Sequence, residues 1–292
     1  MSRTIYALLV GIDAYPAPIP ALSGCVNDIE SFAASLQERV NQDKGVTLRL
    51  KTLKNAEATR KTVIDSFRVH FGLAKTGDVV LFYYSGHGSQ EPSPAEFWAI
   101  EPDHLDETLV CYDSRSPGGW HLADKEIAKL IGEVAANGPH VAAILDCCHS
   151  GSGTRDAEVV RRIETDQRRR PIESFILSPE EVQATLTRSG GQSNRSWNIS
   201  NEGRHILLAA CASDQEAKEF TGNGQRRGAF SFFLGEALKS ANGVPTYRDL
   251  FARIAALVST QVRNQSPQFE ASHSVDLDAV FLDGAIQPAP PT

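Results

Sequence analysis

Two short apolar runs are each followed by a glycine-containing loop whose side chains can do chemistry. The run 79–84 leads into Ser85-Gly86-His87-Gly88, and the run 141–145 leads into Asp146-Cys147-Cys148-His149-Ser150-Gly151. A cysteine attacks as its thiolate, and because its free pKa is about 8.5 it needs a nearby base or positive charge at neutral pH. A histidine beside it supplies that base. The two loops therefore predict nucleophilic catalysis by a cysteine and a histidine.

Such catalysis also needs donors for the negative oxygen that develops when a thiolate attacks a carbonyl. The backbone N–H groups of Gly88 and Cys148 lie in these loops and are suitable donors. The glycines on either side of His87 let the backbone turn tightly, so that the imidazole stands at the edge of a sheet. A single cysteine after an apolar run is more often a core residue. The joint pattern of the two loops is what favours catalysis.

Strand-length and helix-length patterns alternate through the first half of the chain. Apolar runs predict strands at 5–12, 46–53, 78–84 and 141–147, and apolar residues at helical spacing predict helices at 28–40, 58–71 and 123–136. This alternation predicts an α/β fold with a central, mostly parallel sheet and helices on both faces. Active groups gather at the carboxyl ends of the strands in such folds. Both loops lie at such ends.

The second half begins with a long stretch that has no regular pattern. Residues 151–202 are rich in Ser, Gly, Arg, Gln and Asn, with one short helix expected at 179–186, and we expect a flexible linker there. Order returns with a strand at 205–212, helices at 229–239 and 247–262, and a weak strand at 275–282. We therefore divide the chain into a larger part, 1–150, the linker 151–202, a smaller part, 203–284, and a disordered tail, 285–292.

Composition excludes several classes of protein. The 292 residues are 41% apolar and carry a formal net charge of −7, which is typical of a globular protein and argues against nucleic-acid binding. No apolar run reaches the roughly 18 residues of a membrane helix, and the apolar N-terminal run is interpreted as a strand rather than a secretion signal. Five cysteines, an odd number, fit the reducing cytoplasm, and their spacing lacks the paired motifs of a structural zinc site.

Four ordered segments resemble one family. Residues 84–88 and 146–151 are similar to the catalytic histidine and cysteine segments of metacaspases, including the bacterial members called orthocaspases, within the caspase-like cysteine peptidases. Residues 22–28 resemble the early Gly-Cys-x-Asn-Asp segment of that family, and residues 209–215 with 228–231 resemble the start of its smaller subunit. The likeness spans about 5–262, apart from the linker. The caspase signature Gln-Ala-Cys-x-Gly is absent, so cleavage after aspartate is not inferred.

The resemblance implies a caspase-like fold and a role for each matching residue. Cys148 is the expected nucleophile of a cysteine endopeptidase and His87 its general acid and base. Family members of this kind cleave after arginine or lysine, and the matching acidic positions are Asp28 and Asp146, with Ser85 nearby. A carboxylate two residues before Cys148 can reach a guanidinium bound beside the thiol, in a charge-assisted pair. Protein or peptide substrates with a basic residue before the cleaved bond are the expected partners.

Simpler structural roles remain open for several of these residues. Asp28 could be a helix N-cap and Asp146 a turn former. Cys147 is interpreted as a small buried residue at a strand end, and a Cys147–Cys148 disulfide would form only with strain.

The linker contains a cluster of arginines that a peptidase specific for basic residues could cleave. Its arginines are candidates for self-cleavage, and we single out Arg155, Arg162 and Arg170. Cleavage there would separate a large N-terminal piece from a small C-terminal one. A solvated charged loop is an equally simple reading. Nucleic-acid contact is weaker, because acidic residues are interspersed among the arginines.

Many metacaspases need calcium, and the residues at the matching positions of this chain indicate whether it shares that requirement. Asp124-Lys125 stands where the family usually has consecutive aspartates, so a lysine takes an expected ligand position and opposes calcium binding. A weaker site would use Asp106, Glu107, Asp124 and Asp156. We expect no organic cofactor and leave calcium dependence open.

Two other classes of function compete with peptidase activity. One is a caspase-like signalling or assembly module with little proteolysis of its own, although such modules commonly lose the histidine or the cysteine. The other is a redox or metal-sensing thiol protein built on Cys147, Cys148 and His149. The resemblance to metacaspases favours a monomer, and the charge and composition of the chain favour no nucleic-acid or membrane partner.

Overall fold

The computed structural model describes residues 3–149, 159–178, 180–182, 205–241, 243–271 and 277–283. Its centre is a six-stranded sheet in the order β11-β8-β7-β3-β1-β2. All neighbouring strands are parallel except β11, which runs antiparallel to β8. The strands are β1 (Arg3–Gly11), β2 (Val46–Lys54), β3 (Val79–Ser85), β7 (His140–Asp146), β8 (His205–Ala209) and β11 (Gln268–Ala271).

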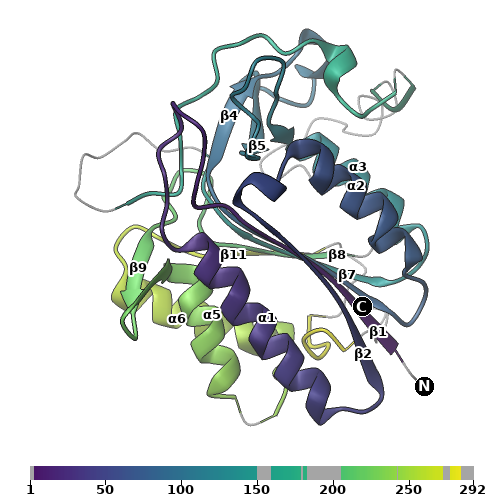
Figure 1. Ribbon diagram of the computed structural model, residues 1–292, viewed down its shortest axis with the longest axis vertical. Helices are drawn as coiled ribbons and strands as arrows, with labels where there is room; N and C mark the ends of the chain where they lie inside the picture. The colour runs from purple at the N-terminus through teal and green to yellow at the C-terminus, as the bar shows by residue number, and fades with distance from the viewer. Residues whose placement is uncertain are drawn as a thin grey trace.

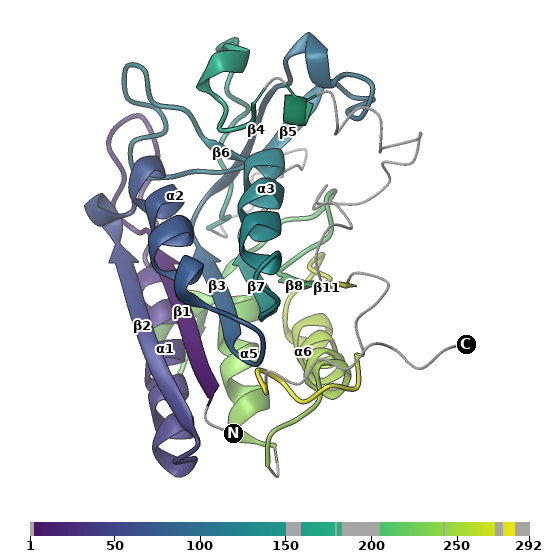
Figure 2. The ribbon, with the colours of Figure 1, turned by 90° about the vertical axis from the view of Figure 1, so that its right-hand side faces the viewer.

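Helices cover both faces of this sheet (Figures 1 and 2). On one face lie α1 (Cys25–Gln42), α5 (Ala229–Lys239) and α6 (Tyr247–Gln261), and on the other lie α2 (Arg60–Val69) and α3 (Asp124–Ala135). Alternate residues of each central strand point to opposite faces, so in β1 Leu9 packs in the first core and Leu8 in the second. Strands buried on both faces need continuous apolar runs, which is why the sequence pattern located them.

Two smaller sheets lie outside the central one. β4 (Gly88–Pro92), β5 (Leu105–Leu109) and β6 (Leu122–Ala123) form an antiparallel sheet, and β9 (Glu219–Gly222) pairs with β10 (Gln225–Gly228) in a hairpin. β4 begins three residues after β3 ends, so the small sheet stands at the carboxyl ends of the central strands (Figure 1). Short 3₁₀ turns lie at Asn55–Glu57, Phe71–Leu73, Ala95–Phe97 and Ile172–Ser174.

The expected α/β fold with its mostly parallel sheet is confirmed, but two expectations about the second half fail. The edge strand is β11 rather than 275–282; of the latter stretch, residues 277–282 are described and contribute only a bridge between Val280 and Thr246. The predicted linker contains a stretch, 159–178, that packs against the domain and buries charged side chains such as Arg161 and Arg170. Polar composition hid this packing because buried ion pairs and a few apolar side chains such as Phe175, without regular spacing, hold the segment.

Candidate active site

The ends of β3 and β7 bring the two chemically active loops together. Ser85 pairs with Asp146 in the parallel register, so His87 and Cys148 each follow two residues beyond that pair. Both are almost fully buried. A Cβ at Gly88 would approach the Cys148 carbonyl oxygen to 2.1 Å, so only glycine allows the loops to come this close.

The His87 imidazole is held in one orientation. Its Nε2 lies 2.9 Å from the Pro20 carbonyl oxygen, and because a carbonyl only accepts, Nε2 carries the hydrogen. Nδ1 is then a lone pair, and it is buried with no hydrogen-bond partner among the described residues. Burial, together with the nearby Arg161 charge, lowers the pKa of His87 to about 4. The ring is therefore neutral at physiological pH and can accept a proton at Nδ1.

Two backbone N–H groups point at a single carbonyl oxygen, that of Arg161. Gly88 N–H donates to it at 3.0 Å and Cys148 N–H at 3.3 Å. These are the two donors expected to hold the oxygen of a substrate under attack. The carbonyl between them belongs to the segment that follows the Cys148 loop in sequence.

The Arg161 side chain lies in what we call the acidic cluster, the buried carboxylates of Asp28, Asp146 and Glu219. Its Nη2 is 2.8 Å from Asp28 Oδ2 and 3.6 Å from Glu219 Oε1, and its Nη1 is 3.1 Å from Asp146 Oδ2. Nη1 also donates to Ser85 Oγ at 2.8 Å. Burial acts to lower the pKa of Arg161, but the carboxylates outweigh it and raise that pKa, so the guanidinium stays charged.

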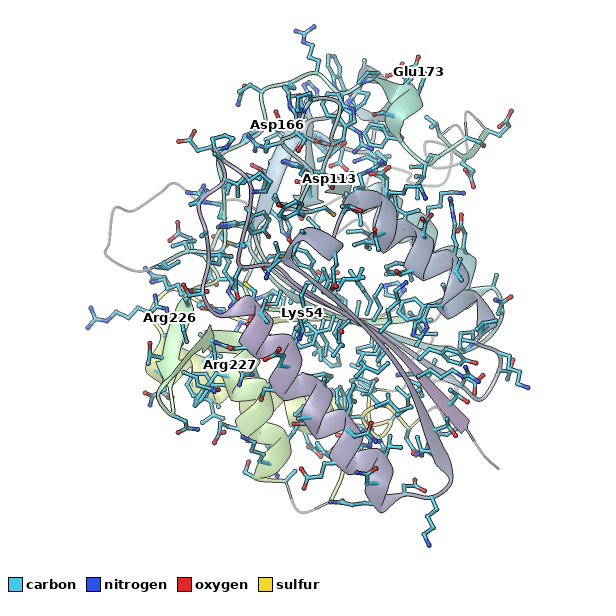
Figure 3. The ribbon with its side chains drawn as sticks, in the orientation of Figure 1. Lys54, Asp113, Asp166, Glu173, Arg226 and Arg227 are labelled. Carbon is cyan, nitrogen blue, oxygen red and sulfur yellow. The ribbon has the colours of Figure 1, made fainter. Side chains whose placement is uncertain are left out.

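The acidic cluster has other partners besides Arg161. Arg227 Nε donates to Asp28 Oδ1 at 2.7 Å, and Arg226 Nε donates to Glu219 Oε2 at 3.1 Å; both arginines lie on β10 beside the start of α1 (Figure 3). Ser231 donates to Asp146 from both its backbone N–H and its hydroxyl. Burial raises the pKa of Asp146 despite these donors and the Arg161 charge. These donors hold the carboxylates of the acidic cluster in place, independently of Arg161.

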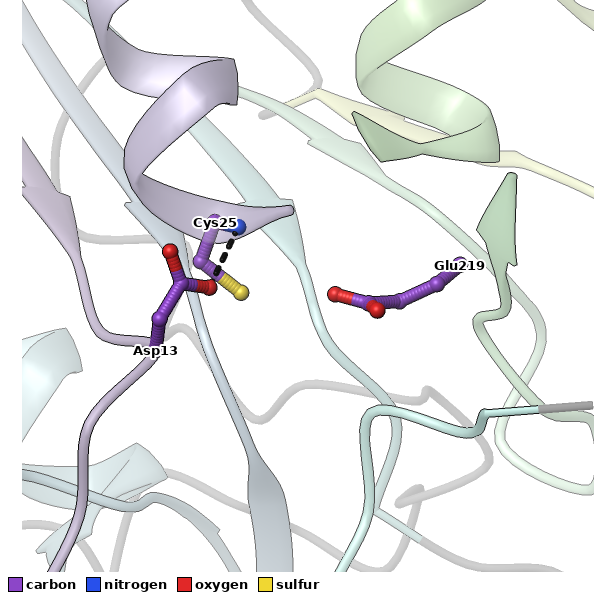
Figure 4. A group of neighbouring side chains, drawn as sticks. All are labelled: Asp13, Cys25 and Glu219. Carbon is purple, nitrogen blue, oxygen red and sulfur yellow. Dashed lines mark hydrogen bonds between the residues drawn. The ribbon is translucent and has the colours of Figure 1, made fainter. Parts of the chain in front are cut away.

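Asp13 and Glu219, the latter from the acidic cluster, fix the start of α1, which carries Asp28. Asp13 accepts from the backbone N–H of Cys25 at 2.8 Å, and the Glu219 carboxylate extends from β9 toward the same helix start (Figure 4). There Glu219 accepts from the Gly24 N–H at 2.8 Å. Carboxylates are favourable at a helix N-terminus, where N–H groups have no helical partner. Asp13, Cys25 and Glu219 are close enough to suggest a metal site, but these backbone bonds account for both carboxylates.

An extended stretch, which we call the inserted segment, residues 159–163, lies across the strand ends. Val160 forms an antiparallel bridge with Lys218, and Arg162 forms a parallel bridge with Gly88. Arg161 N–H donates to the Ala217 carbonyl at 2.9 Å. A peptide held by an added strand is a recurring mode of peptide recognition, and here the chain itself supplies the peptide.

The comparisons agree with this geometry. The family model of the caspase domain (Peptidase C14) matches residues 4–277. The chain belongs to the caspase-domain family. It is therefore a cysteine-type peptidase, a hydrolase, and its resemblance to metacaspases is confirmed by curated relatives.

Relatives of this caspase-domain protein come from distant organisms. Metacaspase-1 of Mycosarcoma maydis is 23% identical, over 94% of this chain and 72% of its own length. Metacaspase-2 of Trypanosoma brucei brucei is 25% identical, over 96% of this chain and 76% of its own. Among solved structures, a Geobacter sulfurreducens protein has a TM-score of 0.64 at 24% identity, covering 94% and 95% of the two chains. A procaspase, pro-sf-caspase-1, has a TM-score of 0.53 at 12% identity, covering 92% and 87%. These likenesses show the caspase fold.

In this caspase-domain protein, neither Arg162 nor Arg170, the two described arginines among those singled out for self-cleavage, occupies the acidic cluster. Arg155 lies outside the described residues. Arg162 directly follows Arg161 and pairs with Glu216. Arg170 is fully buried away from the acidic cluster, where it pairs with Glu91 and Glu126 at 2.9 Å each. Sequence alone could not choose among neighbouring arginines, because the register of the inserted segment decides which one reaches the carboxylates.

The candidate calcium ligands surround a lysine. Lys125 Nζ lies 2.6 Å from Asp106, 2.7 Å from Glu101 and 3.3 Å from Asp124, all buried. Burial raises the pKa of Asp124 to about 7. Glu107 is not among the partners of that ammonium, although burial and neighbouring carboxylates raise its pKa. Asp156 lies outside the described residues. The residues present do not fit a divalent cation, since the ammonium fills the place between the carboxylates.

The remaining thiols act as buried packing groups. Cys147 Sγ lies 3.5 Å from His149 Nε2, and Cys211 Sγ lies 3.7 Å from the Cys147 carbonyl oxygen. All five cysteines are free and buried. The groups of side chains in metal-binding geometry within the described ranges include none of Cys147, Cys148 and His149. No helix in the described part of the chain is long and apolar enough to cross a membrane.

Sequence reasoning missed Glu219, and it did not single out Arg161 from the other candidate arginines. Glu219 opens β9, and its sequence neighbours carry no motif that marks it. Arg161 was one of several arginines in a polar stretch. Only the fold brings them to Asp28 and Asp146.

Proposed function

We propose that this caspase-domain protein is an endopeptidase that cleaves after arginine or lysine, with Cys148 as nucleophile and His87 as base. One observation carries the proposal. The Arg161 guanidinium lies among three carboxylates while its carbonyl oxygen accepts from Gly88 and Cys148. A substrate arginine bound in the same way would present its carbonyl carbon to the Cys148 thiol.

The proposed reaction uses groups whose states the geometry supports. His87 Nδ1 takes the thiol proton, and the Cys148 thiolate attacks the carbonyl carbon. The two backbone N–H groups hold the resulting oxyanion. Protonated His87 then gives its proton to the leaving amine, and water releases the acyl group from Cys148. The Pro20 carbonyl stabilises the imidazolium, since it accepts from Nε2 throughout.

The same geometry supports self-cleavage between Arg161 and Arg162. The inserted segment is already bound as an extended strand, with its Arg161 carbonyl between the two donors. Until it is cut or displaced, the segment competes with any external substrate for the acidic cluster. The uncut chain is therefore proposed to be a precursor with low activity toward other proteins.

Calcium is not required in this proposal. The Lys125 ammonium already neutralises the carboxylates that a calcium ion would need. Activity should therefore be equal in calcium and in a calcium chelator.

The test is cleavage of fluorogenic peptides that end in arginine, lysine or aspartate, together with mass spectrometry of the chain itself. Wild type should cleave the basic peptides and release a fragment that begins at Arg162. Cys148→Ala should do neither, whereas Cys147→Ala, the neighbouring thiol, should keep both activities. Cleavage after aspartate, or basic-peptide cleavage that survives Cys148→Ala, would contradict the proposal. Silence of a folded wild type in every condition would favour the signalling module.

A further inference from the structure

The residue after Arg161 also meets a carboxylate. Arg162 Nη2 lies 3.7 Å from Glu216 Oε1, with 23% of the arginine side chain and 13% of the glutamate side chain exposed. Glu216 belongs to the stretch that leads into β9, one residue before Ala217, whose carbonyl accepts from Arg161 N–H. We infer that Glu216 determines specificity for the residue after the cleaved bond, and that the site selects two consecutive basic residues. This inference rests on the proposed function.

Backbone contacts fix the position of Arg162 independently of its side chain. Arg162 bridges to Gly88, and the next residue, Ile163, donates its N–H to the Gly88 carbonyl at 3.1 Å. On the other side of the bond, Val160 bridges to Lys218. Any peptide bound through these backbone groups places its residue after the cleaved bond beside Glu216. The contact is therefore a property of the site and not only of this segment.

Two glutamates of one short stretch thus lie on either side of the bond proposed to be cut. Glu219 reaches the Arg161 guanidinium, and Glu216 reaches that of Arg162. Carboxylates placed this way select by charge: a basic residue is attracted, and an acidic one is repelled. Because the Glu216 pair is partly exposed, water and salt weaken it, and we expect an effect of several-fold rather than of thousands.

A charge swap within the full chain tests the inference. Arg162→Glu should slow self-cleavage after Arg161 about ten-fold, because attraction to Glu216 becomes repulsion. Adding Glu216→Arg to that variant should restore most of the rate. Glu236→Arg, which places the same charge on an exposed part of α5, should restore nothing. A double variant no faster than Arg162→Glu alone overturns the inference.

Peptides test the site in the self-cleaved enzyme. Internally quenched peptides that differ only after the arginine should rank Arg above Ala above Glu, with Arg and Glu about ten-fold apart in kcat/KM. Glu216→Gln should remove most of that difference while the Ala peptide keeps its rate. Equal rates for all three peptides in wild type would overturn this inference and leave the proposed cleavage after arginine intact. Absence of any Cys148-dependent cleavage would instead refute the proposed function, and this inference with it.

Discussion

Two regions of the molecule bury a cation among three carboxylates. Lys125 lies among Glu101, Asp106 and Asp124 beneath the small sheet, and Arg161 lies in the acidic cluster at the ends of β3 and β7. Both cations are nearly inaccessible to water. In both places the carboxylates outweigh burial and raise the pKa of the cation.

The two regions differ in how the cation is attached. Lys125 is a buried residue of α3, so the packing of that helix holds its ammonium among the carboxylates. Arg161 belongs to a segment that crosses the strand ends, and its carboxylates keep Arg227, Arg226 and Ser231 when it departs. The difference indicates that Lys125 serves structure, and it is what the proposed exchange of Arg161 for a substrate guanidinium requires of the acidic cluster.

The largest effect is expected at the fixed cation. Lys125→Met leaves three buried carboxylates without their ammonium, and breaking such a buried pair costs about 3–5 kcal/mol. Urea unfolding should therefore show a loss of this size. Lys239→Met is the matched control, because the Lys239 side chain is 63% exposed and its loss should change stability little. Equal losses in the two variants would remove the distinction between the two regions.

The next effect concerns recognition at the acidic cluster. Asp28→Asn keeps the shape of the side chain but removes a charge 2.8 Å from the bound guanidinium. Loss of one partner from a buried charge pair costs at least about 2 kcal/mol, so kcat/KM for an arginine peptide should fall by at least about thirty-fold. The check is peptide kinetics on a variant whose circular dichroism matches wild type. Asp65→Asn, on the exposed surface of α2, should keep wild-type kinetics. Wild-type kinetics in Asp28→Asn, or an equal loss in both variants, would contradict the role of Asp28.

A smaller effect is expected when the exchangeable cation is removed. Arg161→Gln should reduce the free energy of unfolding by only about 1–2 kcal/mol, less than half the loss in Lys125→Met, because the carboxylates keep other donors. Self-cleavage before Arg162 should stop. Urea unfolding and mass spectrometry measure both. A loss as large as that of Lys125→Met would mean that the inserted segment is a permanent part of the fold.

These two regions also mark what sequence could predict. Apolar periodicity located the central strands, and the glycine-containing loops predicted that His87 and Cys148 lie at neighbouring strand ends, where the parallel register of β3 and β7 places them. Their roles as base and nucleophile stay a prediction. Lys125 was visible as a departure from a family pattern. Asp28 and Asp146 were singled out through the family resemblance. Glu219 was not, since it lies on β9 and meets the other two carboxylates only after folding. The sequence did not predict that 159–163 pairs with the strand ends, because this segment is polar and its contacts are made by backbone groups and charges.

The smallest effect comes from a buried group that has no carboxylate to keep it charged. Burial lowers the pKa of His140 to about 3, whereas an unfolded histidine titrates near 6.5. As pH falls below about 6.5, the unfolded chain takes up a proton there and the folded chain does not, so stability falls by up to about 1.4 kcal/mol per pH unit. His140→Gln can still hydrogen-bond the Tyr247 hydroxyl, and it should flatten the decline in unfolding free energy between pH 6 and pH 4 by about 1 kcal/mol per unit.

His104→Asn is the control, because His104 is exposed and has a φ of 60°, which asparagine tolerates; it should leave the slope unchanged. Comparison of the two slopes removes the opposing contribution of Glu91 and Asp124, whose pKa values burial raises to about 7. If His140→Gln keeps the wild-type slope, His140 takes up its proton in the folded state, and burial without a countercharge does not keep a group neutral in this protein.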